Sequence, residues 1–189
     1  IIPYLGQHCG LTDRSVVADV GCGTGLSTEL FLENGNPVFG IEPNDAMRAA
    51  AEIYLKAFPN FTAVNATSTE TTLPDASVDM IVAAQAFHWF DPERTRPEFR
   101  RTLKPEGWVV LIWNERQLDT TPFLIDDEAF LLEHANDYVN VRHENIHAEE
   151  IADFFQKNFE SATFPNQQVF DFEGLKGRML SSSYMPSES

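Results

Sequence analysis

A D-x-G-x-G-x-G motif close to the amino terminus contains the residues best suited to hold a cofactor. An apolar run that ends at Val20 predicts a buried strand, and a helix is predicted to begin near Leu26. Glycines in the turn between them let a ligand approach the backbone and accept positive φ angles. The free N–H groups at a helix start favour a carboxylate or a phosphate. The predicted ligand-binding turn comprises Gly21, Cys22, Gly23 and Gly25.

Asp19 restricts which ligand this turn accepts. A pyrophosphate placed over the turn, as in dinucleotide sites, would be repelled by a fixed carboxylate. The glycine spacing also differs from the G-x-G-x-x-G that is typical of nicotinamide sites. S-Adenosylmethionine suits Asp19 better, because it carries an ammonium and a sulfonium group and its carboxylate can accept from backbone N–H groups. A glycine turn without a ligand is the simplest alternative at this point.

A second acidic residue, Glu42, stands directly after the second predicted strand, 37–41. At that position of a doubly wound sheet, it could accept hydrogen bonds from both hydroxyls of a ribose. The alternative is an exposed glutamate in a loop. The loop 65–70 follows the third predicted strand, 61–64, and an adenine could lie there against small side chains and backbone amides.

Three aromatic residues and a histidine follow the fourth predicted strand, 78–84, in the segment 85–91. This is the edge at which open α/β sheets bind ligands. An aromatic wall can hold a sulfonium by cation–π attraction, and His88 could act as a base or a hydrogen-bond donor. Alternatively, Phe87 and Phe90 belong to the core and His88 caps a loop. The candidates for the wall of an acceptor pocket are Trp89, Trp113 and Asn114.

Strands and helices alternate five times up to residue 116, which predicts a Rossmann-like, doubly wound, mostly parallel sheet with helices on both faces. We predict one domain over 1–189. Its parts are a cofactor-binding core (11–116), a helical lid or substrate-side insertion (117–160), and a candidate closing strand (162–172) within a segment that ends in an irregular tail (161–189). The alternative is that the last strand of the sheet is absent, either because it lies outside this sequence or because the sheet edge is open. Helices are predicted over 1–10, 24–33, 46–58, 91–103, 122–138, 147–159 and 173–180, and the fifth strand over 108–113 after a turn at 104–107.

The composition describes a globular and acidic chain. Its 189 residues are 43% hydrophobic, and 29 acidic against 13 basic residues give a net charge of -16. Binding of nucleic acid or of an anionic membrane needs a basic face, so neither is an expected partner. The basic cluster, formed by arginines between residues 94 and 101, is interpreted as a solvated helix face. We expect a small-molecule substrate and a monomer or homodimer.

The cysteines and histidines bear on the cellular compartment and on whether a metal site is expected. Cys9 and Cys22 form no C-x-x-C pair, and no apolar run has the length of a membrane span or the form of a signal peptide, so we expect a reducing cytoplasm. His143 and His147 have H-x-x-x-H spacing without a compelling third ligand, so no metal site is predicted. Because the chain opens at Ile1 without an initiating Met, we expect a piece of a longer protein.

Four motifs in order resemble those of class I S-adenosylmethionine-dependent methyltransferases, over about residues 10–116. They are Val17 to Gly25, Glu42-Pro43, Leu73 to Asp79 leading into Gln85 to Phe90, and Leu103 to Trp108. The 85–91 block is similar to the type 11 group of small-molecule methyltransferases, which includes trans-aconitate methyltransferase-like proteins. The resemblance implies methyl transfer to a small molecule, possible acceptors being a carboxylate or a hydroxyl.

The resemblance also implies roles for individual residues. The three glycines of the turn pack on the methionine part of S-adenosylmethionine, with Asp19 near its ammonium, and Glu42 holds the ribose. The other implied cofactor contacts are Cys22 and Pro43 within the matched motifs, Ser68 and Thr69 beside the adenine, and Gln85 at the methionine end. One departure is that Thr69 stands where family members often have an acid. Two alternatives are a nicotinamide-dependent Rossmann oxidoreductase and a cofactor-binding module without catalysis.

Overall fold

The computed structural model describes residues 1–136, 138, 148–180 and 185. It divides into two compact units, Ile1–Trp113 and Asn114–Ser189, and each is described by itself.

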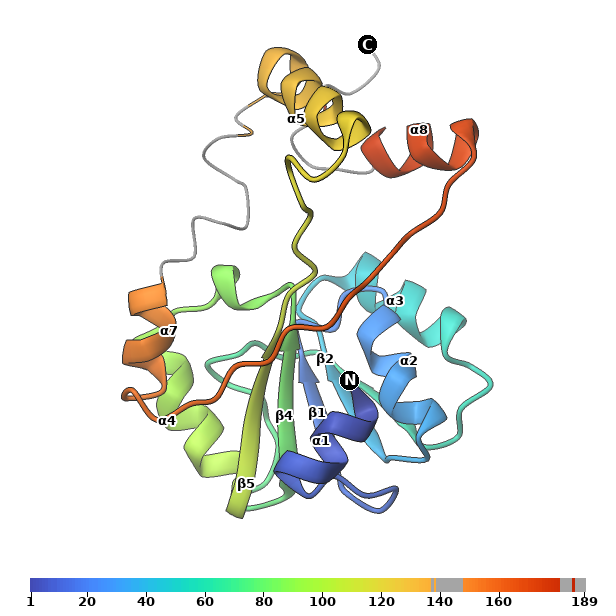
Figure 1. The fold of residues 1–189 in the computed structure, drawn as a ribbon. Coiled ribbons are helices and arrows are strands. Elements are labelled where there is room, and N and C mark those ends of the chain that lie inside the picture. Colours follow the sequence, from blue (N-terminus) through green and yellow to red (C-terminus); the bar gives the residue numbers. More distant parts are fainter. Residues whose placement is uncertain (137, 139–147, 181–184, 186–189) are drawn as a thin grey trace. The chain divides into compact units, whose positions relative to one another are not determined.

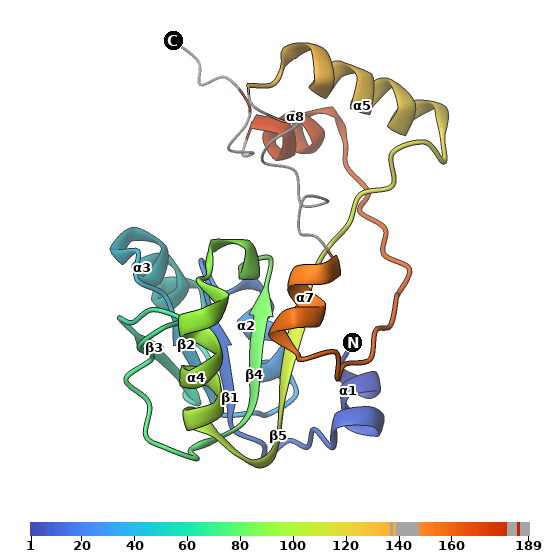
Figure 2. The same cartoon turned by 90° about the vertical axis from the view of Figure 1, so that its left-hand side faces the viewer.

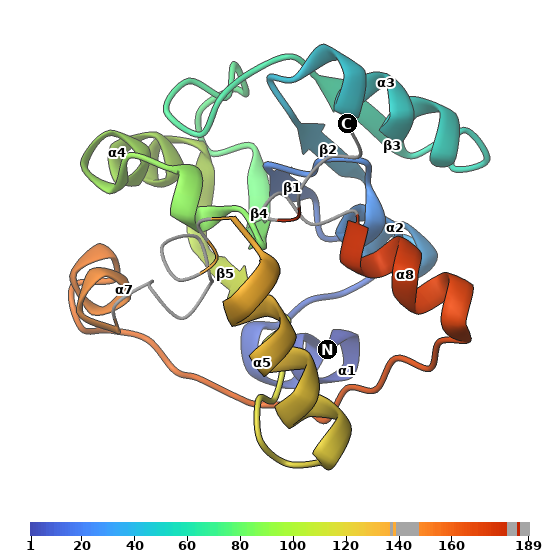
Figure 3. The ribbon, with the colours of Figure 1, turned by 90° about the horizontal axis from the view of Figure 1, so that it is seen from above.

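The first unit is built on a sheet of five parallel strands in the order β3-β2-β1-β4-β5 (Figure 1). The strands are β1 (Val17–Val20), β2 (Val38–Ile41), β3 (Phe61–Val64), β4 (Val78–Ala84) and β5 (Leu103–Ile112). The helices are α1 (Ile2–Cys9), α2 (Leu26–Glu33), α3 (Asp45–Tyr54) and α4 (Pro92–Thr102), with a short 3-10 segment, η1 (Phe87–Trp89). Seen from above, α4 lies on one side of the sheet and α1 and α2 on the other (Figure 3). The predicted doubly wound α/β architecture is confirmed.

The core of the first unit forms where the central strands meet the helices. β1 is buried along its whole length, and β4 is buried except at Asp79 and Ala84. Such continuous apolar strands are expected when both faces of a parallel sheet are covered. The central cluster comprises Leu5, Leu11, Val17, Phe31, Leu32, Val38, Leu55, Met80 and Val82.

Helix boundaries follow the local capping signals. The side chain of Asn44 accepts from two N–H groups of the first turn of α3, and Asp91 does the same for α4. Helix α1 ends at Gly10, whose φ of 68° suits a glycine after a helix. These ends agree with the predicted ones and fix where α4 starts relative to the segment 85–91.

The fifth strand starts earlier than predicted. Leu103 already pairs with Val78, and the register then shifts, so that Met80 pairs with Trp108. The residues between, predicted as a turn, therefore form an irregularity inside β5. Lys104 stabilises this irregularity, because its Nζ donates to both carboxylate oxygens of Asp79 at 2.9 and 2.8 Å.

The second unit contains α5 (Pro122–His134), α7 (Ala148–Phe154) and α8 (Phe172–Leu180). The predicted closing strand over 162–172 is wrong: residues 158–171 are irregular, and α8 begins at Phe172. Alternation of apolar residues favours a strand only where one face is buried, yet Val169 here is 85% exposed. Within the described ranges, no helix combines the length and apolarity needed to cross a membrane.

Thr72, in the loop before β4, has a φ of 61°, a conformation that is unfavourable for a β-branched residue. We expect Thr72→Gly to raise the free energy of unfolding by about 1 kcal/mol, because relief of backbone strain outweighs the added freedom of the unfolded chain. Urea unfolding followed by circular dichroism measures the change. Thr62→Gly, at an exposed position in β3, is the matched control and should lower stability. Equal destabilisation by both substitutions would contradict the prediction.

Candidate cofactor-binding site

The glycine turn joins the end of β1 to the start of α2. It is held against β2, because the N–H groups of Gly21 and Cys22 both donate to the carbonyl of Ile41, at 2.8 and 3.2 Å. Gly21, Gly23 and Gly25 all have positive φ angles, of 73°, 56° and 93°. This backbone path needs glycine at each of the three positions.

The three glycines differ in what surrounds them. A Cβ added to Gly21 would lie 2.6 Å from Ala86 Cβ, and one added to Gly25 would lie 2.7 Å from Leu55 Cδ1. Packing inside the protein therefore requires glycine at Gly21, whereas at Gly25 the end of the Leu55 side chain would have to shift. A Cβ on Gly23 would meet nothing within 4 Å. The space above Gly23 is thus open to a ligand.

Asp19 lies in β1 and is fully buried. Its Oδ2 accepts from the hydroxyls of Ser27 at 2.7 Å and Thr28 at 2.6 Å, both in the first turns of α2. Its Oδ1 is buried and has no hydrogen-bond partner in the part of the chain that the structure describes. Burial raises the pKa of Asp19, while the two hydroxyls oppose that shift. The carboxylate therefore has one occupied oxygen and one available oxygen.

Glu42 connects the end of β2 to the glycine turn. Its Oε2 accepts from the N–H of Gly23 at 3.0 Å, and its Oε1 accepts from the N–H of Asn44 at 2.8 Å. A carboxylate oxygen can accept more than one hydrogen bond, so both remain able to bind a ribose hydroxyl. The sequence predicted Glu42 as a ligand-binding residue, but it did not predict the hydrogen bond that Glu42 accepts from the backbone of the turn. Pro43, beside it, is exposed.

Cys22 is a packing residue in this turn. It is 5% exposed, and burial, followed by the nearby carboxylates of Asp19 and Glu42, raises the pKa of its thiol to about 12. A thiol that stays protonated is a poor nucleophile. Cys22 can therefore contact a ligand but is not suited to covalent chemistry.

The loop after β3 is anchored to α4. Ser68 is buried, and its Oγ lies 3.0 Å from Thr95 Oγ1, while the Thr69 hydroxyl pairs with that of Thr67 at 3.2 Å. Glu98 Oε1 accepts from both the N–H and the hydroxyl of Thr71, at 2.7 and 2.6 Å. The contacts to Thr95 and Glu98 were missed from the sequence, since only the i, i+3 spacing of two polar residues on α4 hints at them.

Part of the segment 85–91 lies in the core, and part of it is exposed. Phe87 is buried, and its ring lies edge-on to those of Phe90 and Trp113, with centroids 6.0 and 6.3 Å apart. Phe87 therefore belongs to the core, as the structural alternative predicted. His88 and Trp89 are exposed, and their ring centroids are 4.9 Å apart. They belong to η1, in the segment that joins the end of β4 to the start of α4 (Figure 2).

The remaining predicted residues lie around this segment. Gln85 has a φ of 54°, and its N–H donates to the carbonyl of Ile112 at 2.9 Å, which ties the end of β4 to the end of β5. Asn114 opens the second unit, where its Oδ1 accepts from Asn166 at 2.7 Å. The ligand-binding roles assigned to Gln85, His88, Trp89, Trp113 and Asn114 stay predictions.

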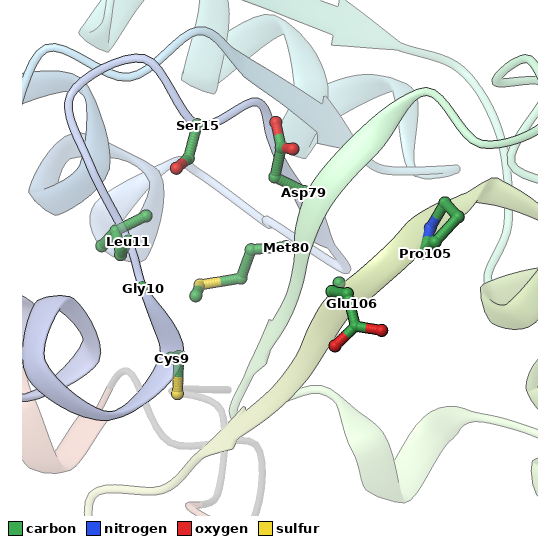
Figure 4. A pocket seen from close by; sticks show the side chains of 9 residues that line it. Cys9, Gly10, Leu11, Ser15, Asp79, Met80, Pro105 and Glu106 are labelled. Atoms are coloured by element: carbon green, nitrogen blue, oxygen red, sulfur yellow. The ribbon is translucent and has the colours of Figure 1, made fainter.

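The residues that the structure describes contain no group of three or more potential metal ligands among His, Cys, Asp and Glu. His143 and His147 lie outside the described residues. A cavity of about 170 Å³ lies at the opposite, amino edge of the sheet, where Met80 extends from β4 toward Leu11 (Figure 4). It shares no residue with the glycine turn.

A class of protein follows from this arrangement: a Rossmann-like α/β domain whose glycine turn and two acidic residues suit a nucleoside cofactor with a positive charge. Comparison with known proteins narrows that class. Residues 18–111 match a family model described as a methyltransferase domain. The chain thus contains a methyltransferase domain. The nicotinamide alternative is not supported.

Individual relatives and solved structures are similar to this chain in sequence or in fold. An uncharacterised methyltransferase of Mycobacterium tuberculosis is 40% identical over 100 residues, which cover 53% of this chain and 40% of the relative. A crystal structure of an S-adenosylmethionine-dependent methyltransferase from Aquifex aeolicus has a TM-score of 0.62 and 20% identity, covering 82% of this chain and 77% of that one. A structure from Anabaena variabilis, provisionally classed as a methyltransferase, has a TM-score of 0.63 and 26% identity, with 83% and 59% covered.

The chain spans less than half the length of the curated relatives it matches. The activity, substrates and partners of the whole protein are therefore proposals.

Substitution of Gly23 should affect ligand binding more than folding. We expect Gly23→Ala to lower the affinity for S-adenosylhomocysteine at least about tenfold, because its Cβ enters the open space, while the left-handed φ costs about 1–2 kcal/mol of stability. Gly21→Ala, which collides with Ala86, should destabilise more. Calorimetric titration and urea unfolding measure the two effects. Wild-type affinity in Gly23→Ala would show that the ligand lies elsewhere.

Glu98 anchors the loop 67–71 to α4, and this anchoring is sensitive to low pH. The Arg101 hydrogen bond, followed by those from Thr71, lowers the pKa of Glu98 to about 2, against an opposing effect of burial. Its contribution to stability is therefore present above the ordinary carboxyl pKa and is lost as the pH falls from about 5 toward 2.

We expect Glu98→Gln to lower the free energy of unfolding at pH 7 by about 1–3 kcal/mol and to flatten the loss of stability in acid. Unfolding midpoints measured between pH 7 and pH 3 provide the test. Glu93→Gln, on the exposed face of the same helix, is the control and should keep the wild-type profile. An unchanged acid slope in Glu98→Gln would refute the assignment.

Proposed function

We propose that this chain transfers a methyl group from S-adenosylmethionine to a small-molecule acceptor, at a carboxylate or a hydroxyl oxygen. The observation that carries the proposal is a methyltransferase domain whose glycine motif combines an unpartnered oxygen on Asp19 with open space at Gly23. The 85–91 block supports a finer placement in the trans-aconitate methyltransferase-like branch of the type 11 group. The net charge of -16 argues against nucleic acid as the acceptor.

The chain's main task is alignment. S-Adenosylmethionine supplies a methyl group on a positively charged sulfur, which is already a good electrophile. The turn of Gly21, Cys22, Gly23 and Gly25 would hold the methionine part, with Asp19 facing its ammonium and Gln85 at the same end. Glu42 and Pro43 would hold the ribose, and Ser68 and Thr69 the adenine. Correct positioning of two reactants can contribute several kcal/mol to the rate, roughly 7 or more in favourable cases.

The acceptor side is assigned to η1 and the end of β5. Trp89, Trp113 and Asn114 would form the wall, and His88 would orient the acceptor or take its proton. A carboxylate acceptor is already ionised at neutral pH and needs no base, whereas a hydroxyl acceptor must lose a proton. His88 therefore matters most for a hydroxyl acceptor.

Binding and turnover test the proposal separately. We expect S-adenosylhomocysteine to raise the melting temperature of the chain and NADH to leave it unchanged. Incubation with methyl-labelled S-adenosylmethionine and a panel of carboxylic acids and hydroxyl compounds should label at least one acceptor. Stabilisation by NADH alone would overturn the cofactor assignment. Binding without labelling of any acceptor would replace the proposed activity by that of a non-catalytic cofactor-binding module.

If a hydroxyl compound is the acceptor, His88→Ala should lower kcat by about 10²- to 10⁴-fold and remove one limb of its pH profile. With a carboxylate acceptor, kcat should change little. His8→Ala, in α1, changes a histidine that stacks on Tyr4 and is the control. An unaltered kcat and pH profile for a hydroxyl acceptor would eliminate His88 as the base.

A further inference from the structure

Two hydroxyl groups on the same oxygen of Asp19 have no role in the chemistry described so far. Ser27 and Thr28 are neighbours in α2, and both donate to Oδ2, at 2.7 and 2.6 Å. Thr28 is fully buried, and Ser27 is half-buried. A single hydroxyl would suffice to connect the helix to the strand. The second makes the carboxylate strongly asymmetric.

The asymmetry leaves Oδ1 with all of its accepting capacity. This oxygen is buried, and in the described ranges no donor of the chain reaches it. Buried polar atoms in folded proteins nearly always have a partner, so an exception at a ligand site points to a group that arrives from outside. Gly23, four residues further along the same motif, has open space where its Cβ would stand, so the turn that follows Asp19 is accessible to a ligand.

The charges around Asp19 indicate what kind of group this is. The thiol of Cys22 in the turn and the carboxylate of Glu42 at the end of β2 are close enough to interact electrostatically with each other, and Cys22 also with Asp19. On α3, Arg48 pairs with Asp45 and donates to the Glu42 carbonyl. No ion pair to Asp19 is found among the described side chains. A positively charged donor fits this environment best.

We propose that Ser27 and Thr28 are positioning residues for cofactor recognition: by occupying Oδ2 of Asp19, they reserve Oδ1 for the ammonium group of the methionine part. The inference rests on the proposed cofactor site and adds the residues that give it selectivity for an amino acid. The two side chains act through Asp19 and do not touch the ligand.

The test compares two ligands that differ only at the methionine end. S-Adenosylhomocysteine carries the amino acid, and 5′-methylthioadenosine keeps the adenine, ribose and thioether but lacks it. In Thr28→Val and in Ser27→Ala, we expect the affinity for S-adenosylhomocysteine to fall about tenfold, the effect of one charge-assisted hydrogen bond. The affinity for 5′-methylthioadenosine should stay within about twofold, below the effect of one neutral hydrogen bond. Thr28→Ser should restore wild-type binding.

The pH dependence of ligand binding also tests the inference, because it would not change if the hydroxyls of Ser27 and Thr28 had a purely structural role. Loss of a hydroxyl donor disfavours the ionised form of Asp19 and so raises its pKa further. As the pH is lowered, binding of S-adenosylhomocysteine should therefore begin to weaken at a higher pH in the variants than in the wild type. Binding of 5′-methylthioadenosine should show no such displacement.

Thr95→Val is the matched control, because it removes a buried hydroxyl pair of the same kind at Ser68, on the adenine side. It should weaken both ligands equally. Equal weakening of both ligands in Thr28→Val and Ser27→Ala would overturn the inference and make the hydroxyls merely structural. If Thr28→Val does not fold, the half-buried Ser27→Ala variant still decides. Failure of the wild type to bind S-adenosylhomocysteine would instead refute the proposed cofactor.

Discussion

The burial of the Asp19 carboxylate is the constraint on which the rest of the site depends. A carboxylate taken out of water in the central strand is costly unless hydrogen bonds replace its hydration. Both donors that the structure shows come from α2, so the helix must begin where its first turns reach back to β1. That requirement sets the length and path of the turn between them. The positive φ angles of its glycines are a consequence of this closure.

A second carboxylate makes the same turn a negative site. Glu42 holds the N–H of Gly23, so the ligand-facing backbone is fixed from β2 as well as from α2. Burial first, and then the carboxylates of Asp19 and Glu42, raise the pKa of Cys22, so both acids act on the same turn. Two like charges around one open space favour a ligand with a positive charge and disfavour a pyrophosphate. The electrostatics of the turn therefore favour the proposed cofactor, S-adenosylmethionine, over a dinucleotide.

Local signals predicted most of the first unit, because its strands and caps depend on neighbouring residues. β3 and β4 were predicted at their observed ends, and Asn44 and Asp91 cap α3 and α4 close to the predicted helix starts. The start of β5 was missed, since it depends on Lys104 reaching Asp79, 25 residues earlier in the chain. The strand predicted over 162–172 failed because alternation alone does not supply a partner strand. In the site, the glycines and acids were recognisable by type, whereas the hydroxyls of Ser27 and Thr28 were not, because their role appears only once β1 and α2 are packed.

Helix α4 connects the two halves of the proposed site. It begins at Asp91, immediately after the exposed His88 and Trp89 of η1, and its first turns carry Thr95 and Glu98, which hold the loop assigned to the adenine. A shift of that loop must move the hydroxyl of Thr95 or leave it buried without its partner. Because Thr95 and Glu98 lie within the first two turns of α4, the loop and η1 are attached to the same end of one helix. One rigid element thus keeps the cofactor side and the proposed acceptor side in register, which is what an in-line transfer between two bound molecules requires.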